Sequence, residues 1–154
     1  MNLSTHVAVG AAVGYATKNP ILGFFAGFLS HHIIDQIPHT DGGELHVDLK
    51  DFTRDTRIIA IVSIDFILLV FISILLFKKY GLDYPLMMGM FGGAFTDLID
   101  NVPFWSPYLR KTFPMNYFHR FHGFFHFTIE NKKNMWFGIF IQFLLIAISL
   151  KFLL

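Results

Sequence analysis

The sequence contains no cysteine. This absence excludes disulfide bonds, thiolate metal ligands and cysteine nucleophiles. Charged residues are also scarce, at 15% of the chain, and the formal net charge is only +1. A nearly neutral chain lacks the basic surface that neutralises phosphates, so we expect no nucleic-acid partner.

Apolar residues take the place of the missing charges. Hydrophobic residues make up 54% of the chain and aromatic residues 18%, and the mean hydropathy is +0.53. A soluble domain of this size needs more polar surface, so the composition predicts one integral-membrane domain over residues 1–154. The first residues lack the basic region and cleavage site of a signal peptide, and we expect them to belong to the folded protein.

The apolar stretches predict an all-α membrane protein with about five transmembrane or membrane-embedded helices. Residues 57–77 and 136–154 are long and apolar enough to cross a bilayer as ordinary helices. Three shorter stretches, at residues 3–17, 21–37 and 86–102, are glycine-rich and polar at one end. We interpret them as inner helices that neighbouring helices screen from lipid.

Each shorter stretch carries two glycines spaced four apart. These pairs are Gly10 with Gly14, Gly23 with Gly27, and Gly89 with Gly93. Such pairs let helix backbones approach closely where no hydrophobic effect drives their association. The same surfaces would equally suit a homodimer.

Lysine and arginine are distributed unevenly between the two predicted membrane faces. Alternating helices place residues 38–56 and 103–135 on one face, which together with the adjacent Arg57 then carries eight of these cations against four on the other. This bias predicts that the N-terminus and the polar face are cytoplasmic. All eight histidines lie on that face or close to it.

A short pattern occurs twice, over residues 32–38 and again over residues 97–103. In each copy a histidine or aspartate is followed three positions later by aspartate and six positions later by proline. We interpret the pattern as a duplicated helical hairpin. Chance similarity is the alternative, because proline commonly ends helices and aspartate is common near helix ends.

The repeat predicts a metal centre. Residues three apart share one helix face, so each copy offers two inward ligands. The copies supply His32 with Asp35 and Asp97 with Asp100, and the partner helices add His6 and Asp65. Dinuclear carboxylate bundles divide their ligands in this way. Nitrogen and oxygen donors suit one or two divalent ions, with zinc favoured and manganese or iron as alternatives.

A histidine-rich segment predicts a short interfacial amphipathic helix at about residues 115–128. His119, His122 and His126 form one stripe, and the phenylalanines lie largely on other faces, where they would enter lipid. We expect His122 and His126 to bind metal, and His119 and Arg120 to bind an anionic substrate. The alternative is that the segment is only an amphipathic anchor.

The segment after the second helix contains two glycines and can fold back over the helix ends. His39 and Asp41 in this segment are candidate catalytic residues, as a ligand or a general base. A solvated turn is an equal alternative. His31 is expected to point away from the face of His32, and His46 to lie in a solvated loop.

Three of these segments occur together in a known family. The order of Thr5-His6, the segment from Asp35 to Asp41, and His119-Arg120 followed by His126 resembles the small bacterial membrane proteins called LexA-binding inner-membrane hydrolases. In that family the later segments usually read Pro-Asp-x-Asp-His and His-Arg-Gly-x-Thr-His-Ser, and this chain departs from both. The resemblance implies a bacterial inner-membrane protein in which a metal-activated water attacks an ester or phosphoester.

We therefore expect a membrane-embedded metal-dependent hydrolase acting on a lipid or lipid-linked substrate at the cytoplasmic interface. A di-iron oxidase or desaturase is an alternative, because His31-His32 and the pair His122 and His126 resemble fragments of histidine boxes. Two non-enzymatic alternatives also stand. Intramembrane carboxylates occur in cation pathways, and a polar network can also serve a scaffold by fixing helix packing.

Overall fold

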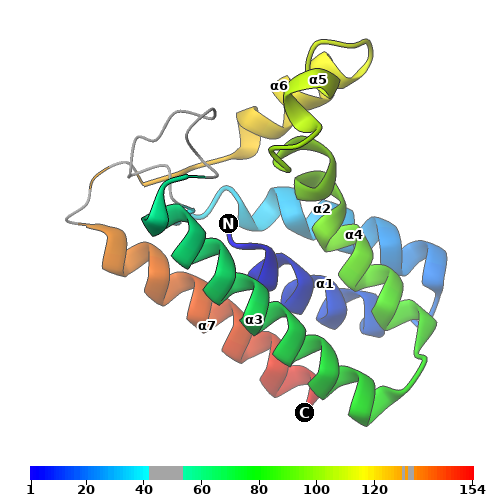
Figure 1. Cartoon of the computed structure of the whole chain (residues 1–154). Helices are drawn as coiled ribbons and strands as arrows, with labels where there is room; N and C mark the ends of the chain where they lie inside the picture. The colour runs from blue at the N-terminus through cyan, green and yellow to red at the C-terminus, as the bar shows by residue number, and fades with distance from the viewer. Residues whose placement is uncertain (42–53, 130, 132–133) are drawn as a thin grey trace.

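The computed structural model describes residues 1–41, 54–129, 131 and 134–154, which form helices joined by short connections (Figure 1). The helices are α1 (Leu3–Thr17), α2 (Pro20–Ile34), α3 (Thr56–Tyr80), α4 (Tyr84–Asp100), α5 (Ser106–Leu109), α6 (Met115–Phe125) and α7 (Met135–Leu153). The all-α prediction is confirmed, and α5 is an element that we did not predict. The loop containing His46 lies outside the described residues.

Polar caps and prolines determine where α2 and α4 begin. The side chain of Asn19 accepts hydrogen bonds from the backbone of Ile21 and Leu22, and Pro20 occupies the first turn of α2. Asp83 similarly accepts from Leu86 at the start of α4. These caps satisfy backbone donors that have no partner within the helix.

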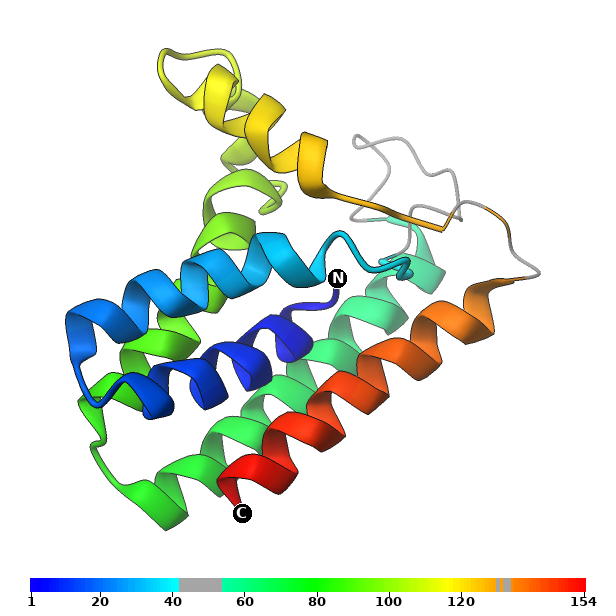
Figure 2. The ribbon, with the colours of Figure 1, turned by 180° about the vertical axis from the view of Figure 1, so that it is seen from behind.

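Helix α1 forms the centre of the bundle and contacts α2, α3, α4 and α7 (Figures 1 and 2). Glycines make its close contact with α4 possible. A Cβ atom added to Gly89 would collide with the backbone of Gly10 and Gly14, and one added to Gly93 would collide with the backbone of His6. The predicted glycine pairs thus lie where helix backbones touch.

Two helices, α3 and α7, are long and apolar enough to cross a membrane. Their outward side chains are apolar and exposed, as Ile67 and Phe140 illustrate. Helices α1, α2 and α4 contain 15, 15 and 17 residues, fewer than the roughly 20 residues that a helix needs to span a bilayer. The prediction of about five membrane helices is therefore not confirmed, and the structure supports two.

Helices α5 and α6 form an arm that projects from the bundle at the end where α1 begins (Figures 1 and 2). Helix α6 is amphipathic, because His122 is buried while Phe124 is 83% exposed. Other exposed aromatic side chains in and next to the arm include Phe104, Trp105, Tyr108, Phe113, Tyr117 and Phe121. The arm contains three lysine and arginine residues and no acidic residue between positions 101 and 129.

Candidate metal centre

Asp35 lies at the centre of a cluster of histidines. It directly follows α2 and is fully buried. Its carboxylate lies 3.2 Å from Nε2 of His6, 3.2 Å from Nε2 of His31, 3.5 Å from Nε2 of His122, 3.8 Å from Nε2 of His39 and 3.8 Å from Nδ1 of His126. A buried carboxylate surrounded by imidazoles is a donor set that divalent transition metals favour.

Four of these imidazoles are held at their outer nitrogen by a hydrogen-bond acceptor. The outer nitrogens and acceptors are Nδ1 of His31 with the Gly93 carbonyl (2.8 Å), Nδ1 of His39 with the Ile37 carbonyl (2.8 Å), Nδ1 of His122 with Asp100 (2.8 Å) and Nε2 of His126 with Asp41 (2.7 Å). Each acceptor holds its ring so that the other ring nitrogen faces Asp35. Metal-binding histidines in proteins are oriented by this type of hydrogen bond.

Three donor atoms, from His31, Asp35 and His122, form a nearly regular triangle. The two Nε2 atoms are 3.4 Å apart, and they lie 3.2 Å and 3.5 Å from Oδ2 of Asp35. An ion with tetrahedral bonds of about 2.0–2.1 Å separates its donors by about 3.3–3.4 Å. The triangle therefore has the size that a zinc-like ion requires. Oδ2 of Asp35 has no hydrogen-bond partner among the described residues.

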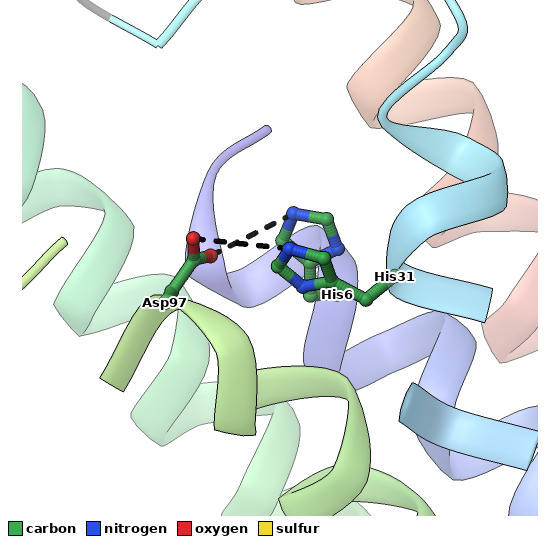
Figure 3. Close-up of side chains that lie close together, drawn as sticks. All are labelled: His6, His31 and Asp97. Atoms are coloured by element: carbon green, nitrogen blue, oxygen red, sulfur yellow. Dashed lines mark ion pairs between the residues drawn. The ribbon is translucent and has the colours of Figure 1, made fainter. Parts of the chain in front are cut away.

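His6, His31 and Asp97 form a second group of possible ligands (Figure 3). The rings of His6 and His31 stack with centroids 3.8 Å apart, and Asp97 lies 3.7 Å and 3.9 Å from their Nε2 atoms. Both ring nitrogens of His6 are buried and have no hydrogen-bond partner among the described residues. A buried imidazole without partners is costly unless a ligand satisfies it.

Asp35, His39 and His126 form a third group. The segment that follows α6 runs back beside the segment that follows α2, with Phe127 donating to the Asp35 carbonyl (2.8 Å) and Ile129 to the His39 carbonyl (2.8 Å). This pairing brings Nε2 of His126 to 3.0 Å from Nε2 of His39. Backbone hydrogen bonds therefore position the donors of this group.

The protonation of His39 and His122 differs strongly. Burial, together with the neighbouring α-amino group of Met1, lowers the pKa of His39 to about 4. Burial also disfavours the charged form of His122, but its hydrogen bond to Asp100 and the nearby carboxylate of Asp35 outweigh the effect of burial and raise its pKa to about 9. At neutral pH, His39 is therefore a neutral potential ligand, whereas His122 must release a proton before its Nε2 can bind a metal.

The cluster contains most of the predicted metal ligands. His6, Asp35, Asp97, His122 and His126 are all in the three groups. His39, which we predicted as a catalytic residue acting as a ligand or a general base, lies among the donors, and Asp41 contacts His126.

The structure places His32 apart from the cluster. Its ring packs against the rings of Phe28, Phe121 and Phe125, at centroid distances of 4.9, 5.0 and 5.7 Å. Neither ring nitrogen has a hydrogen-bond partner among the described residues. His31, which we expected to point elsewhere, is the ligand candidate of this pair, because one residue along a helix changes direction by about 100°.

Asp65 and Asp100 lie outside the three groups as well. Asp65 accepts hydrogen bonds from the backbone nitrogens of Leu3 (2.9 Å) and Ser4 (3.1 Å), so it caps α1 from the neighbouring helix α3. Asp100 binds Nδ1 of His122 and lies 2.9 Å from Nδ1 of His119. It also accepts a hydrogen bond from Arg110. Asp100 therefore orients the ring of His122 from the side opposite Asp35.

A polar cavity of about 310 Å³ lies beside the cluster. It is lined by Asp41, Asn101, His119, His122, Gly123, His126 and Thr128. A second cavity of about 720 Å³ shares Thr128 and is lined mainly by apolar residues, including Phe127, Ile129 and Phe137. Arg120, predicted to bind substrate with His119, is exposed on α6. The histidine cluster is therefore adjacent to space for a polar group and to space for an apolar one.

The resemblance to the LexA-binding inner-membrane hydrolases remains a prediction that the fold does not test. Comparison with protein-family models, with curated proteins and with solved structures finds no match to this chain. The case for a metal centre therefore depends on the geometry of the residues around Asp35.

Proposed function

We propose that the protein is a membrane-embedded, metal-dependent hydrolase that acts on a lipid or lipid-linked ester or phosphoester. The observation that carries this proposal is the arrangement around Asp35, where four imidazoles held at one ring nitrogen direct the other ring nitrogen at one buried carboxylate. A divalent ion held there would polarise the substrate and lower the pKa of a bound water towards neutrality.

Residues of the polar cavity supply the remaining functions. Asp41 lines the cavity and contacts His126, so its carboxylate is placed to accept a proton from an attacking water. The side chain of His119 lines the same cavity and is 43% exposed, and Asp100 holds its Nδ1. His119, with the nearby charge of Arg120, would bind an anionic head group.

The surroundings of the cluster favour a lipid substrate. Helices α3 and α7 are the two candidate membrane spans, and α1 begins beside Asp65, inside the length of α3. The cluster is therefore recessed within the bundle, below an arm that exposes aromatic rings. The apolar cavity would accept an acyl or isoprenoid chain while the polar cavity receives the head group.

The distribution of cations favours the cytoplasmic side of a bacterial inner membrane for this site. Iron would find suitable donors in the same cluster, so the oxidase alternative remains a competitor. The two enzyme classes differ in their reactants, because hydrolysis consumes water whereas an oxidase consumes dioxygen.

Hydrolysis can be tested with detergent-purified protein in mixed micelles. Phosphatidic acid would serve as the phosphoester and diacylglycerol as the carboxyl ester, with release of phosphate or fatty acid as the readout. We expect hydrolysis of one substrate that chelation abolishes, that zinc or manganese restores, and that Asp41→Asn lowers at least tenfold. Asp83→Asn, which alters a cap at the far end of α4, should leave the rate unchanged. Metal-loaded protein that hydrolyses neither substrate, or an iron-dependent consumption of dioxygen, would argue against a hydrolase.

A further inference from the structure

The cluster offers more donors than one ion can use. Five imidazoles surround Asp35, and Asp97 adds a second, partly buried carboxylate. A zinc-like ion takes about four ligands in protein sites. We propose that the centre binds two divalent ions bridged by Asp35, an inference that rests on the proposed metal-dependent function and extends it.

The chain arranges the donors as two matched pairs. His31 precedes Asp35 by four residues and His39 follows it by four, while His122 and His126 are themselves four apart. His31 lies opposite His122 with ring centroids 5.3 Å apart, and His39 lies opposite His126 at 4.8 Å. Each pair thus contains one histidine from residues 31–39, which surround Asp35, and one histidine from residues 122–126, at the end of α6.

The two oxygens of Asp35 are directed to different histidines. Oδ2 faces Nε2 of His31 and His122, at 3.2 Å and 3.5 Å. Oδ1 faces Nε2 of His6 at 3.2 Å and Nε2 of His39 at 3.8 Å, whereas Nδ1 of His126 lies 3.8 Å from Oδ2. A carboxylate that serves one ion with each oxygen is the usual bridge of a two-metal site.

The second position already accommodates a positive charge. The α-ammonium group of Met1 lies 2.7 Å from Oδ1 of Asp35 and 2.9 Å from Nε2 of His39. This ammonium group occupies the space between Oδ1 and Nε2 of His39, so an ion at the second position would replace it. The first position, between His31 and His122, borders Oδ2, which has no hydrogen-bond partner among the described residues.

Two bridged ions narrow the substrate class. Sites with two ions about 3.5–4 Å apart stabilise both the attacking and the leaving oxygen of an in-line displacement at phosphorus. Among the proposed substrates, the lipid phosphoester therefore fits this centre better than the carboxyl ester. In that reaction, water forms a P–O bond, the ester P–O bond breaks, and the leaving alcohol receives a proton.

The number of ions can be measured without an activity assay. We would load the purified protein with manganese and determine the bound metal by elemental analysis and its magnetic coupling by electron paramagnetic resonance. The wild type should bind two ions with a spin-coupled signal. His39→Ala/His126→Ala should bind one ion with an uncoupled six-line signal, and Asp83→Asn should match the wild type.

A single bound ion in the wild type, or two uncoupled ions that persist in His39→Ala/His126→Ala, would overturn the bridged pair while leaving a metal centre in place. Failure of the wild type to bind any ion would instead overturn the proposed function itself. His39→Gln/His126→Gln repeats the measurement with side chains of similar polarity, should the alanine variant not fold. A spin-coupled manganese signal in the wild type would by itself support two bridged ions, without any variant.

Discussion

Asp100 accepts a hydrogen bond from Nδ1 of His122 at 2.8 Å, and this contact turns Nε2 of His122 toward Asp35. A carboxylate behind a metal-binding imidazole positions the ring and strengthens it as a ligand. We therefore expect Asp100→Asn to weaken metal binding by about 10–100-fold. Titration against a coloured chelator would measure the change, with Asp83→Asn as the matched control. Equal affinity in both variants would mean that Asp100 has no role in positioning His122.

The raised pKa of His122 predicts that metal binding depends on pH. With a pKa of about 9, His122 carries a proton at pH 7.5 that must leave when Nε2 becomes a ligand. We expect release of about one proton from His122, and an affinity that rises about tenfold per pH unit until about pH 9. His39 has a pKa of about 4 and is already neutral above pH 7, so it does not make the metal affinity depend on pH between pH 7 and 9. Calorimetry in buffers of different ionisation enthalpy would measure the release, and an affinity that is flat from pH 7 to 9 would refute this assignment.

Adjacent histidines in α2 should respond oppositely to the same substitution. His31→Leu removes a donor next to Asp35, so we expect loss of metal at the first position. His32→Leu replaces an imidazole without polar partners inside a phenylalanine cage, so it should retain metal and unfold at an equal or higher temperature. Elemental analysis and thermal unfolding in detergent would compare the two variants. Metal loss in His32→Leu alone would reverse the assignment.

Asp65 should contribute to stability and not to metal binding. It satisfies the backbone nitrogens of Leu3 and Ser4, which otherwise lack a partner at the start of α1. Asp65→Ala should lower the free energy of unfolding by about 1–2 kcal/mol, as loss of a helix cap does. Asp65→Asn, which keeps an acceptor, should lose less. The metal content of both variants should equal that of the wild type, and a loss of metal would show that Asp65 is a ligand.

Part of the site could have been predicted from the glycine spacing alone. Three ligand candidates continue the glycine pairs at the same interval: His6 precedes Gly10 and Gly14, His31 follows Gly23 and Gly27, and Asp97 follows Gly89 and Gly93. Residues four apart share a helix face, so these side chains must face the helix contact that the glycines form. This spacing distinguishes His31 from His32. The pattern spaced by three residues, on which our prediction depended, selected His32.

Other features of the site depend on long-range contacts that the sequence does not encode locally. Asp65 resembles a ligand because it is a carboxylate in an apolar helix, and only the position of α1 shows that it caps a neighbour. His39 meets His126 because the segments after α2 and α6 pair through their backbones. The longer helices were predictable, since apolar runs, prolines and polar caps mark their approximate positions, whereas the four-residue helix α5 was not.

The most direct test of a metal centre at Asp35 is an anomalous-difference map from crystals of protein purified without chelator and supplied with zinc. We predict a peak between Oδ2 of Asp35 and the Nε2 atoms of His31 and His122, at about 2.0–2.2 Å from each. A map with no peak at this position, in which these three side chains contact only one another or water, would contradict the account.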